Sequence, residues 1–327
     1  MSAERVSLKA RSIHVSTIQA VTVDPNAPGR LALASVDAPT PAPGEALVRV
    51  HALSLNRGEV RGAQNAAAGA RPGWDIAGTV QQAAADGSGP KVGQRVVGLL
   101  RTGAWAEVVA VPSANLAVLP DAVSFSQAAT LPVAGLTALY ALDRGDGLME
   151  RNVLVTGASG GVGHLAVQLA AHGGARVTGL VRQERHVASV REAGAQTVVA
   201  DETGAAAKES GPFHLVLESV GGQVLGSVMS MMAPGGLIVC YGTSGGGPAT
   251  FDSALVLRSR FTMTGMLVFN EAARETAGVG LARLARLVAA GVLKPQISIE
   301  APWKEIGPVA QQLLNRAYPG NAVLLVS

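Results

Sequence analysis

The chain has 327 residues, 48% of them hydrophobic and 15% charged, so it exceeds a single hydrophobic core and we expect two domains. Its formal charge of +3, scattered basic residues and 3% aromatic content argue against nucleic-acid binding. One cysteine, Cys240, excludes an intramolecular disulfide and a cysteine-rich zinc site. The N-terminus lacks a signal-peptide core, and no apolar run reaches the ~18 residues of a membrane span, so we expect a cytoplasmic protein.

The first third of the chain predicts short β-strands. Residues 1–16 show no clear period and are expected to form a loose arm. Strands are predicted over residues 18–23, 31–36, 46–53, 77–81, 94–99 and 106–111. Glycine turns separate several of them, a spacing typical of a compact, partly barrel-like β domain.

Alternation of strands and helices begins after Pro120. Helices are predicted over residues 124–131, 135–142, 184–193, 222–232, 271–290 and 303–316. Strands are predicted over residues 152–156, 176–181, 197–200, 214–218, 237–241, 261–268, 297–300 and 322–326. Strands joined through helices form a parallel sheet covered on both faces. The tail resembles the N-terminal region, so we expect it to return and complete the first domain.

One stretch demands a particular ligand: residues 152–174, NVLVTGASGGVGHLAVQLAAHGG. It predicts a strand, a tight glycine turn and a helix, with Ala158-x-Gly160-x-x-Gly163 in the frame of the dinucleotide fingerprint. Such a turn lets backbone approach a pyrophosphate, and the first helical N–H groups bind the anion. The alternative is an ordinary turn between a strand and a helix.

An ordered set of motifs resembles the medium-chain dehydrogenase/reductase superfamily, and most closely its zinc-free quinone oxidoreductase, or zeta-crystallin-like, branch. The motifs include PAPGEALVRV, LNRGEV, GWDIAGTV, AATLPVAGLTAL and APGGLIVCYG, together with the glycine turn. The resemblance implies a doubly wound Rossmann domain, residues 124–267, that binds NADP. It also implies a discontinuous, β-rich, GroES-like catalytic domain formed by residues 1–123 and 268–327, with the active site between the two.

Zinc-containing members of this superfamily hold their metal with a cysteine, a Gly-His-Glu sequence and a second cysteine. The matching positions here read Asn56 and Gly73-Trp74-Asp75, and residues 131–138 contain no cysteine. A catalytic zinc needs three protein ligands. We therefore expect no metal site.

The end of the second Rossmann strand distinguishes NAD from NADP, because an acid there binds the ribose 2′-OH and a basic neighbourhood accepts the 2′-phosphate. Here Val181 occupies the acid position and Arg182 and Arg185 follow it, so the sequence predicts NADPH. Glu184 lies between the arginines and opposes this prediction. The alternative is that both arginines are solvated residues at a helix start.

The resemblance extends the cofactor site to its nicotinamide end, near Thr137, residues 241–243 and residues 266–268. The predicted cofactor-binding residues are Thr137, Ala158, Ser159, Gly160, Gly161, Val162, Gly163, Arg182, Arg185, Tyr241, Gly242, Thr243, Met266 and Val268.

Without zinc, reduction of an electrophilic small molecule is the favoured chemistry. NADPH would deliver hydride to a quinone or to an α,β-unsaturated carbonyl. Asn56 is predicted to position the reacting groups, with an Asx turn as its alternative role. Arg61 replaces a tyrosine common in relatives and is predicted to stabilise negative charge, with a surface role as the alternative.

A second function class stays open: an NADPH-binding protein with little turnover and a structural, sensory or RNA-associated role. The missing tyrosine favours it, and the absence of a basic tract opposes an RNA role. Residues 261–268, FTMTGMLV, form an apolar last strand whose exposed edge would invite pairing, so we expect a homodimer.

Overall fold

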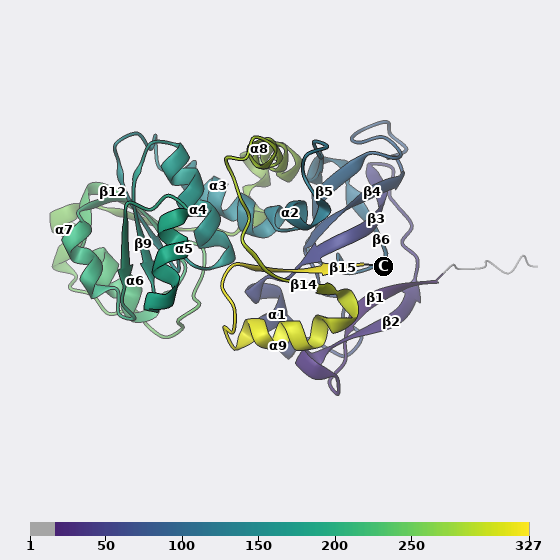
Figure 1. Cartoon of the computed structure of the whole chain (residues 1–327), viewed down its shortest axis with the longest axis horizontal. Coiled ribbons are helices and arrows are strands. Elements are labelled where there is room, and N and C mark those ends of the chain that lie inside the picture. The colour runs from purple at the N-terminus through teal and green to yellow at the C-terminus, as the bar shows by residue number, and fades with distance from the viewer. Residues whose placement is uncertain (1–16, 327) are drawn as a thin grey trace, which may run out of the picture.

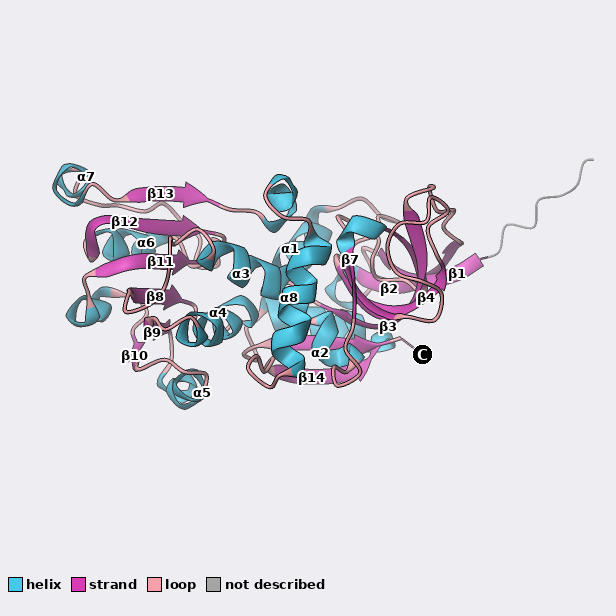
Figure 2. Ribbon diagram, turned by 90° about the horizontal axis from the view of Figure 1, so that it is seen from above, coloured by secondary structure: helices cyan, strands magenta, loops and turns pink. Residues whose placement is uncertain are grey.

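The computed structural model describes residues 17–326. The predicted loose arm, residues 1–16, lies outside the described residues. Two sheets lie toward opposite ends of an elongated molecule, with helices between and around them (Figures 1 and 2). The predicted α/β architecture, with one parallel sheet and a second, β-rich part, is confirmed. No helix within the described residues is both long and apolar enough to span a membrane.

One sheet is parallel throughout, with six strands in the order β10-β9-β8-β11-β12-β13. Its strands are β8 (Asn152–Thr156), β9 (Arg176–Val181), β10 (Thr197–Ala200), β11 (Phe213–Glu218), β12 (Met232–Cys240) and β13 (Thr262–Gly265). Val153, Leu154 and Val155 of the interior strand β8 are fully buried, as expected where helices cover both faces. The strand order reverses between β8 and β11, and ligands bind at the carboxyl ends of strands at such a point.

Helices accompany this sheet along the chain. They are α3 (Leu136–Leu142), α4 (Gly161–His172), α5 (Val187–Glu192), α6 (Gly222–Met229) and α7 (Ala254–Ser259). α3 packs against α4, and both contribute to the larger of the hydrophobic clusters. This cluster also includes residues of α8 (Ala277–Ala289), so one apolar core runs from the parallel sheet toward the other half of the molecule.

The other sheet has seven strands and joins the N-terminal part of the chain to its tail. Its strands are β3 (Glu45–Ser54), β4 (Asp75–Gln82), β5 (Arg95–Leu99), β6 (Val108–Pro112), β7 (Leu116–Val118), β14 (Ile297–Pro302) and β15 (Asn321–Leu325). β15 runs antiparallel to β3, with Val323 opposite Ser54. The tail therefore pairs with a strand from the N-terminal part of the chain.

The remaining elements surround this second sheet. They are the paired strands β1 (Thr17–Val23) and β2 (Leu31–Asp37) and the helices α1 (Arg57–Asn65), α2 (Phe125–Ala129) and α9 (Ile306–Leu314). α2 contacts β3, β4 and β5, although the predicted Rossmann domain begins at residue 124. The two domain boundaries stay a prediction.

The connection after β13 differs from its prediction. The predicted strand 261–268 is shorter, because β13 ends at Gly265 and a 3₁₀ turn follows over Val268–Ala273. The predicted helix 271–290 starts later, at Ala277 in α8. Glu271 is held by an ion pair with Arg144 at 2.8 Å, which fixes this segment as a separate turn.

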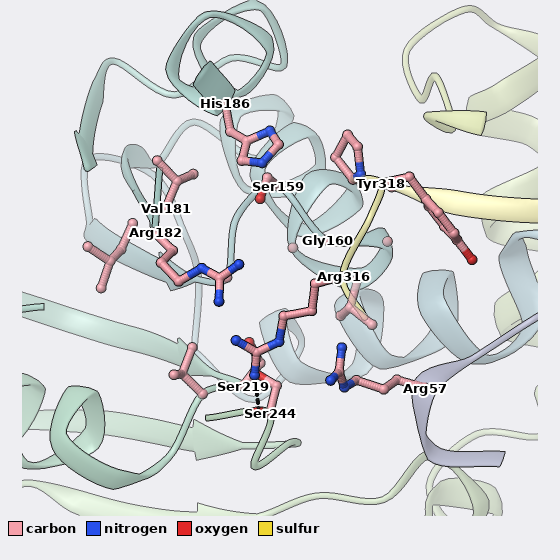
Figure 3. Close-up of a pocket in the computed structure, with 18 of the residues that line it drawn as sticks. Arg57, Ser159, Gly160, Val181, Arg182, His186, Ser219, Ser244, Arg316 and Tyr318 are labelled. Carbon is pink, nitrogen blue, oxygen red and sulfur yellow. Dashed lines mark hydrogen bonds between the residues drawn. The ribbon is translucent and has the colours of Figure 1, made fainter. Parts of the chain in front are cut away.

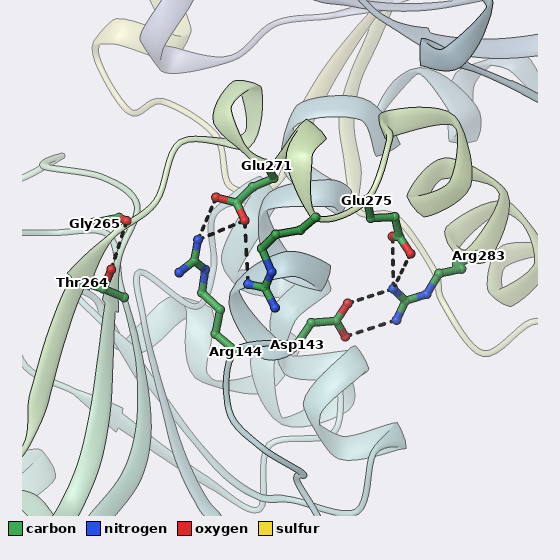
Figure 4. Close-up of polar contacts among 8 residues, drawn as sticks. Asp143, Arg144, Thr264, Gly265, Glu271, Glu275 and Arg283 are labelled. Carbon is green, nitrogen blue, oxygen red and sulfur yellow. Dashed lines mark hydrogen bonds and ion pairs between the residues drawn. The ribbon is translucent and has the colours of Figure 1, made fainter.

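Ion pairs attach this connection to the end of α3 (Figure 4). Besides the Arg144–Glu271 pair, Arg283 of α8 lies 2.8 Å from Asp143 and 3.1 Å from Glu275. The side chain of Glu271 is only 6% exposed, so its pair is shielded from solvent more than a surface pair. These contacts fix the path by which the chain leaves the parallel sheet.

Candidate cofactor and active site

The glycine turn after β8 has the geometry that a dinucleotide requires. Gly157 has φ +60°, in the left-handed region, and a Cβ at Gly163 would lie 2.3 Å from the carbonyl oxygen of Gly157. Gly160 is the N-cap of α4 and makes no side-chain cap hydrogen bond. The N–H groups of the first turn therefore remain available to an anion. The turn fits the pyrophosphate of a dinucleotide.

A cleft with a cavity volume of about 330 Å³ lies between this turn and segments of the second sheet's half. The N–H of Gly320 donates to the carbonyl of Ser159 at 2.9 Å, so the segment before β15 pairs directly with the glycine turn. Leu55 and Asn56, before α1, line the cleft on the same side. Residues far apart in sequence thus form one site.

Four arginines gather at the cleft: Arg57, Arg61, Arg182 and Arg316. In Figure 3, Arg182, Arg316 and Arg57 point toward one space beside Gly160. Within residues 17–326, none of the four forms an ion pair with a carboxylate. Burial, together with the charges of Arg316, Arg61 and Arg182, lowers the pKa of Arg57 to about 10. The cluster suits a ligand with several negative charges.

Backbone carbonyls hold three of these guanidinium groups in place. Arg57 donates to the carbonyls of Leu313 and Leu314 at 3.2 and 3.0 Å. Arg316 and Arg61 both donate to the carbonyl of Ser244, in the loop after β12. The arginine cluster therefore spans both halves of the molecule, since Ser244 and Arg182 follow strands of the parallel sheet.

Asn56 lies above a pair of buried carboxylates. Its Nδ2 donates to Asp75 Oδ2 at 2.7 Å and to Glu59 Oε1 at 3.0 Å, and its backbone N–H donates to Glu59 Oε1 at 2.6 Å. Asn56 and Glu59 form a capping box at the start of α1. Burial raises the pKa of Asp75 to about 7 and that of Glu59 well above its ordinary value, where the neighbouring Asp75 adds to the effect. The side chain thus fixes the loop at the start of α1.

The structure brings only part of the predicted site into the cleft. Predicted residues that line it are Asn56, Ser159, Gly160, Gly161, Val162, Gly163, Arg182 and Tyr241. Predicted residues outside the lining are Arg61, Thr137, Ala158, Arg185, Gly242, Thr243, Met266 and Val268. Ala158, Thr137, Met266 and Val268 are buried in the protein, and Arg185 contacts His186 on the surface. Arg61 reaches the rim through Ser244.

Sequence reasoning missed several lining residues, including Arg57, His186, Ser219, Arg316, Tyr318 and Asn321. Arg57 could have been found, because it directly follows Asn56 at the start of a helix. Arg316 carries no local signal, since it becomes a cleft residue only through the pairing of β15 with β3 and of Gly320 with the glycine turn.

The position of the family's zinc site holds a different arrangement. Trp74 stands where the histidine would be, and both oxygens of Asp75 accept protein N–H groups, from Asn56 and from Val133 at 3.1 Å. Among residues 17–326, no group of three or more histidine, cysteine, aspartate or glutamate side chains has a geometry that could hold a metal ion.

A phosphate-binding turn on a doubly wound sheet, opposed by a second β-rich half across a cleft, defines a nicotinamide-dependent oxidoreductase of two lobes. Two family models match the chain: an alcohol dehydrogenase GroES-like domain over residues 42–121 and a zinc-binding dehydrogenase over residues 161–285. A chloroplastic quinone-oxidoreductase of Triphysaria versicolor is 37% identical over 236 residues, covering 66% of this chain and 69% of that protein.

Solved structures agree. The quinone oxidoreductase of Pseudomonas syringae has a TM-score of 0.83 and 26% identity, covering 94% of this chain and 99% of that one. The Escherichia coli quinone oxidoreductase complexed with NADPH has a TM-score of 0.82 and 24% identity with the same coverage, a likeness of fold. The chain belongs to the quinone oxidoreductase branch of the medium-chain dehydrogenase/reductase superfamily. It is an oxidoreductase that uses a nicotinamide cofactor.

Proposed function

We propose that the protein is a zinc-independent, NADPH-dependent reductase that transfers hydride to a quinone or to an α,β-unsaturated carbonyl. The arginine cluster carries this proposal. A 2′-phosphate adds about −1.5 to −2 charge at pH 7, which NADH lacks. Three guanidinium groups that line the cleft, with Arg61 at its rim and no carboxylate partner among the described residues, match the phosphates of NADPH better than those of NADH.

The geometry suggests how the residues divide the cofactor between them. Arg182 follows β9, where the adenosine ribose lies in this fold, and Arg316 faces it across the cleft, so both are assigned to the 2′-phosphate. The first turn of α4 and Arg57 are assigned to the pyrophosphate. Bound NADPH would supply the hydride, and the chain would orient it and exclude water.

The nicotinamide end is assigned to the ends of β11 and β12, beyond the switch point. Tyr241 lines the cleft there, and we retain Gly242, Thr243, Met266, Val268 and Thr137 as its surroundings. Arg61 lies at the rim, where it could meet negative charge on the acceptor. Zinc independence is supported by the donor set, because Asp75 is occupied by protein N–H groups and Trp74 replaces a ligand.

Alanine variants of the arginines test the cofactor assignment. Arg182→Ala and Arg316→Ala should each weaken NADPH binding by about tenfold and leave NADH binding nearly unchanged, because each removes one charge-assisted contact to the 2′-phosphate. Fluorescence titration measures both dissociation constants. Arg185→Ala tests the other arginine that the sequence predicts for the 2′-phosphate. Arg191→Ala, at an exposed residue of α5, is the matched control. Equal losses for NADPH and NADH would contradict the assignment.

We also propose a homodimer joined through β13. This strand is at the edge of the parallel sheet, and Met263 and Leu267 are 49% and 62% exposed. Leu257 of the neighbouring α7 is 81% exposed. An apolar open edge of this kind favours pairing with a second copy across a two-fold axis.

A further inference from the structure

We propose that Asp75 and Glu59 are positioning residues that turn both N–H bonds of the Asn56 amide inward, so that Asn56 meets the nicotinamide half of the cofactor as a hydrogen-bond acceptor. The group that it would accept from is an N–H of the carboxamide or a hydroxyl of the adjoining ribose. This inference rests on the proposed function.

The contacts of Asn56 account for both of its N–H bonds. An amide nitrogen has two hydrogens, and Nδ2 donates to Asp75 Oδ2 at 2.7 Å and to Glu59 Oε1 at 3.0 Å. Asp75 and Glu59 are 0% and 4% exposed, so water cannot replace Nδ2 as their donor. The carbonyl oxygen Oδ1 faces the backbone N–H of Glu59 in the capping box, and because such an oxygen accepts two hydrogen bonds, it has capacity for one more.

Val133 fixes the orientation from below. Its backbone N–H donates to Asp75 Oδ1 at 3.1 Å, so this oxygen is committed and Oδ2 is left for Asn56. Above about pH 7, where the carboxyl of Asp75 is ionised, a reversed Asn56 amide would place Oδ1 against Asp75 Oδ2, two acceptors in a buried site. The carboxylates therefore select one orientation of the amide.

The contacts around Asn56 place it on the side of β11, β12 and β13, because it bonds to Asp75 and the adjacent Trp74 packs edge-on against Phe269, after β13, at 5.1 Å between ring centroids. Arg182 follows β9 on one side of the switch point, whereas Ser219 and Tyr241 follow β11 and β12 on the other. Asn56 lines the same cavity, before α1, and is partly exposed to it. A dinucleotide with its pyrophosphate on α4 extends its second half toward this side.

Two variants separate orientation from mere packing. In Asp75→Asn, Val133 still requires an oxygen, so the new amide nitrogen faces Asn56 and opposes its Nδ2, and the single orientation is lost. In Glu59→Gln, the amide oxygen can occupy the position of Oε1 and accept both N–H groups of Asn56. The amide nitrogen then occupies the position of Oε2, which has no hydrogen-bond partner among the described residues. Asp75→Asn should therefore disturb the orientation of the Asn56 amide, whereas Glu59→Gln should preserve it.

The test is fluorescence-based or calorimetric binding of two half-cofactors, reduced nicotinamide mononucleotide and 2′-AMP, with circular dichroism to confirm folding. At pH 8, where the carboxyl of Asp75 is ionised, Asp75→Asn should weaken binding of the nicotinamide fragment by about tenfold, and Glu59→Gln by less than about threefold. Binding of 2′-AMP should stay within about twofold in both variants, since it uses the arginines.

Equal losses in Asp75→Asn and Glu59→Gln would overturn the inference, as would loss of binding of both fragments together. Wild-type protein that binds 2′-AMP but not the nicotinamide fragment would also overturn it. Wild-type protein that fails to bind 2′-AMP would instead refute the NADPH assignment, and the nicotinamide fragment would still report on Asn56.

Discussion

Single residues in this site act through neighbours that are distant in sequence. Asp75 occupies a position associated with zinc in relatives, yet its carboxylate accepts from Asn56 and Val133. The chemistry of Asn56 and Arg182 could be predicted from residue type and motif. Arg316 could not, because its role arises only where the tail meets the glycine turn.

The buried carboxylate of Asp75 predicts a pH dependence of stability. Burial raises its pKa from 3.8 to about 7, so between these values the folded state holds a proton that the unfolded state has lost. The free energy of unfolding should therefore fall as pH rises from about 4 to about 7, by at most about 1.4 kcal/mol per pH unit, and level off above that. Asp75→Asn should lack this contribution, and urea unfolding between pH 5 and 8 measures it.

The control for this experiment is Asp86→Asn. Asp86 is exposed, and hydrogen bonds from Ser88 lower its pKa, so this variant should not remove the decline in stability with rising pH. If the unfolding free energies of wild type and Asp75→Asn change in parallel over this range, Asp75 is ionised in the folded state and the prediction fails.

At the scale of elements, regular apolar patterns are sufficient to predict helices and strands where the local sequence preference agrees with the packing of the segment. The order of strands and helices from β8 to β12 follows from apolar runs punctuated by glycine. The segment after β13 was predicted less well, because the ion pair of Glu271 with Arg144 fixes a 3₁₀ turn that no local period indicates. Ends of elements depend on such distant partners.

The open edge of β13 predicts the oligomeric state. Light scattering after size exclusion should give twice the monomer mass of 33.1 kDa. Met263→Lys should shift the protein toward the monomer, because a charge on an edge strand opposes pairing. Val92→Lys, at another exposed apolar residue, is the control and should leave the mass unchanged. A wild-type protein that elutes as a monomer at micromolar concentrations would refute the dimer.

The whole molecule places its chemistry between two sheets, and neither half forms the site alone. The parallel sheet supplies the glycine turn and Arg182, and the other half supplies Asn56, Arg57 and Arg316. The sequence predicts this architecture because short strands, followed by alternating strands and helices, permit few arrangements. It does not predict how many cationic groups meet in the cleft, since that depends on which loops face one another.

The most direct measurement is a parallel titration of wild-type protein with NADPH and NADH, followed by oxidation of the bound cofactor with 1,4-benzoquinone and with a small enone. We expect NADPH to bind at least about tenfold more tightly than NADH, because Arg182 and Arg316 both contact the 2′-phosphate that NADH lacks. We also expect one of the two acceptors to oxidise the bound NADPH. Equal affinity for the two cofactors, or NADPH binding with no oxidation by either acceptor, would contradict the proposed reductase.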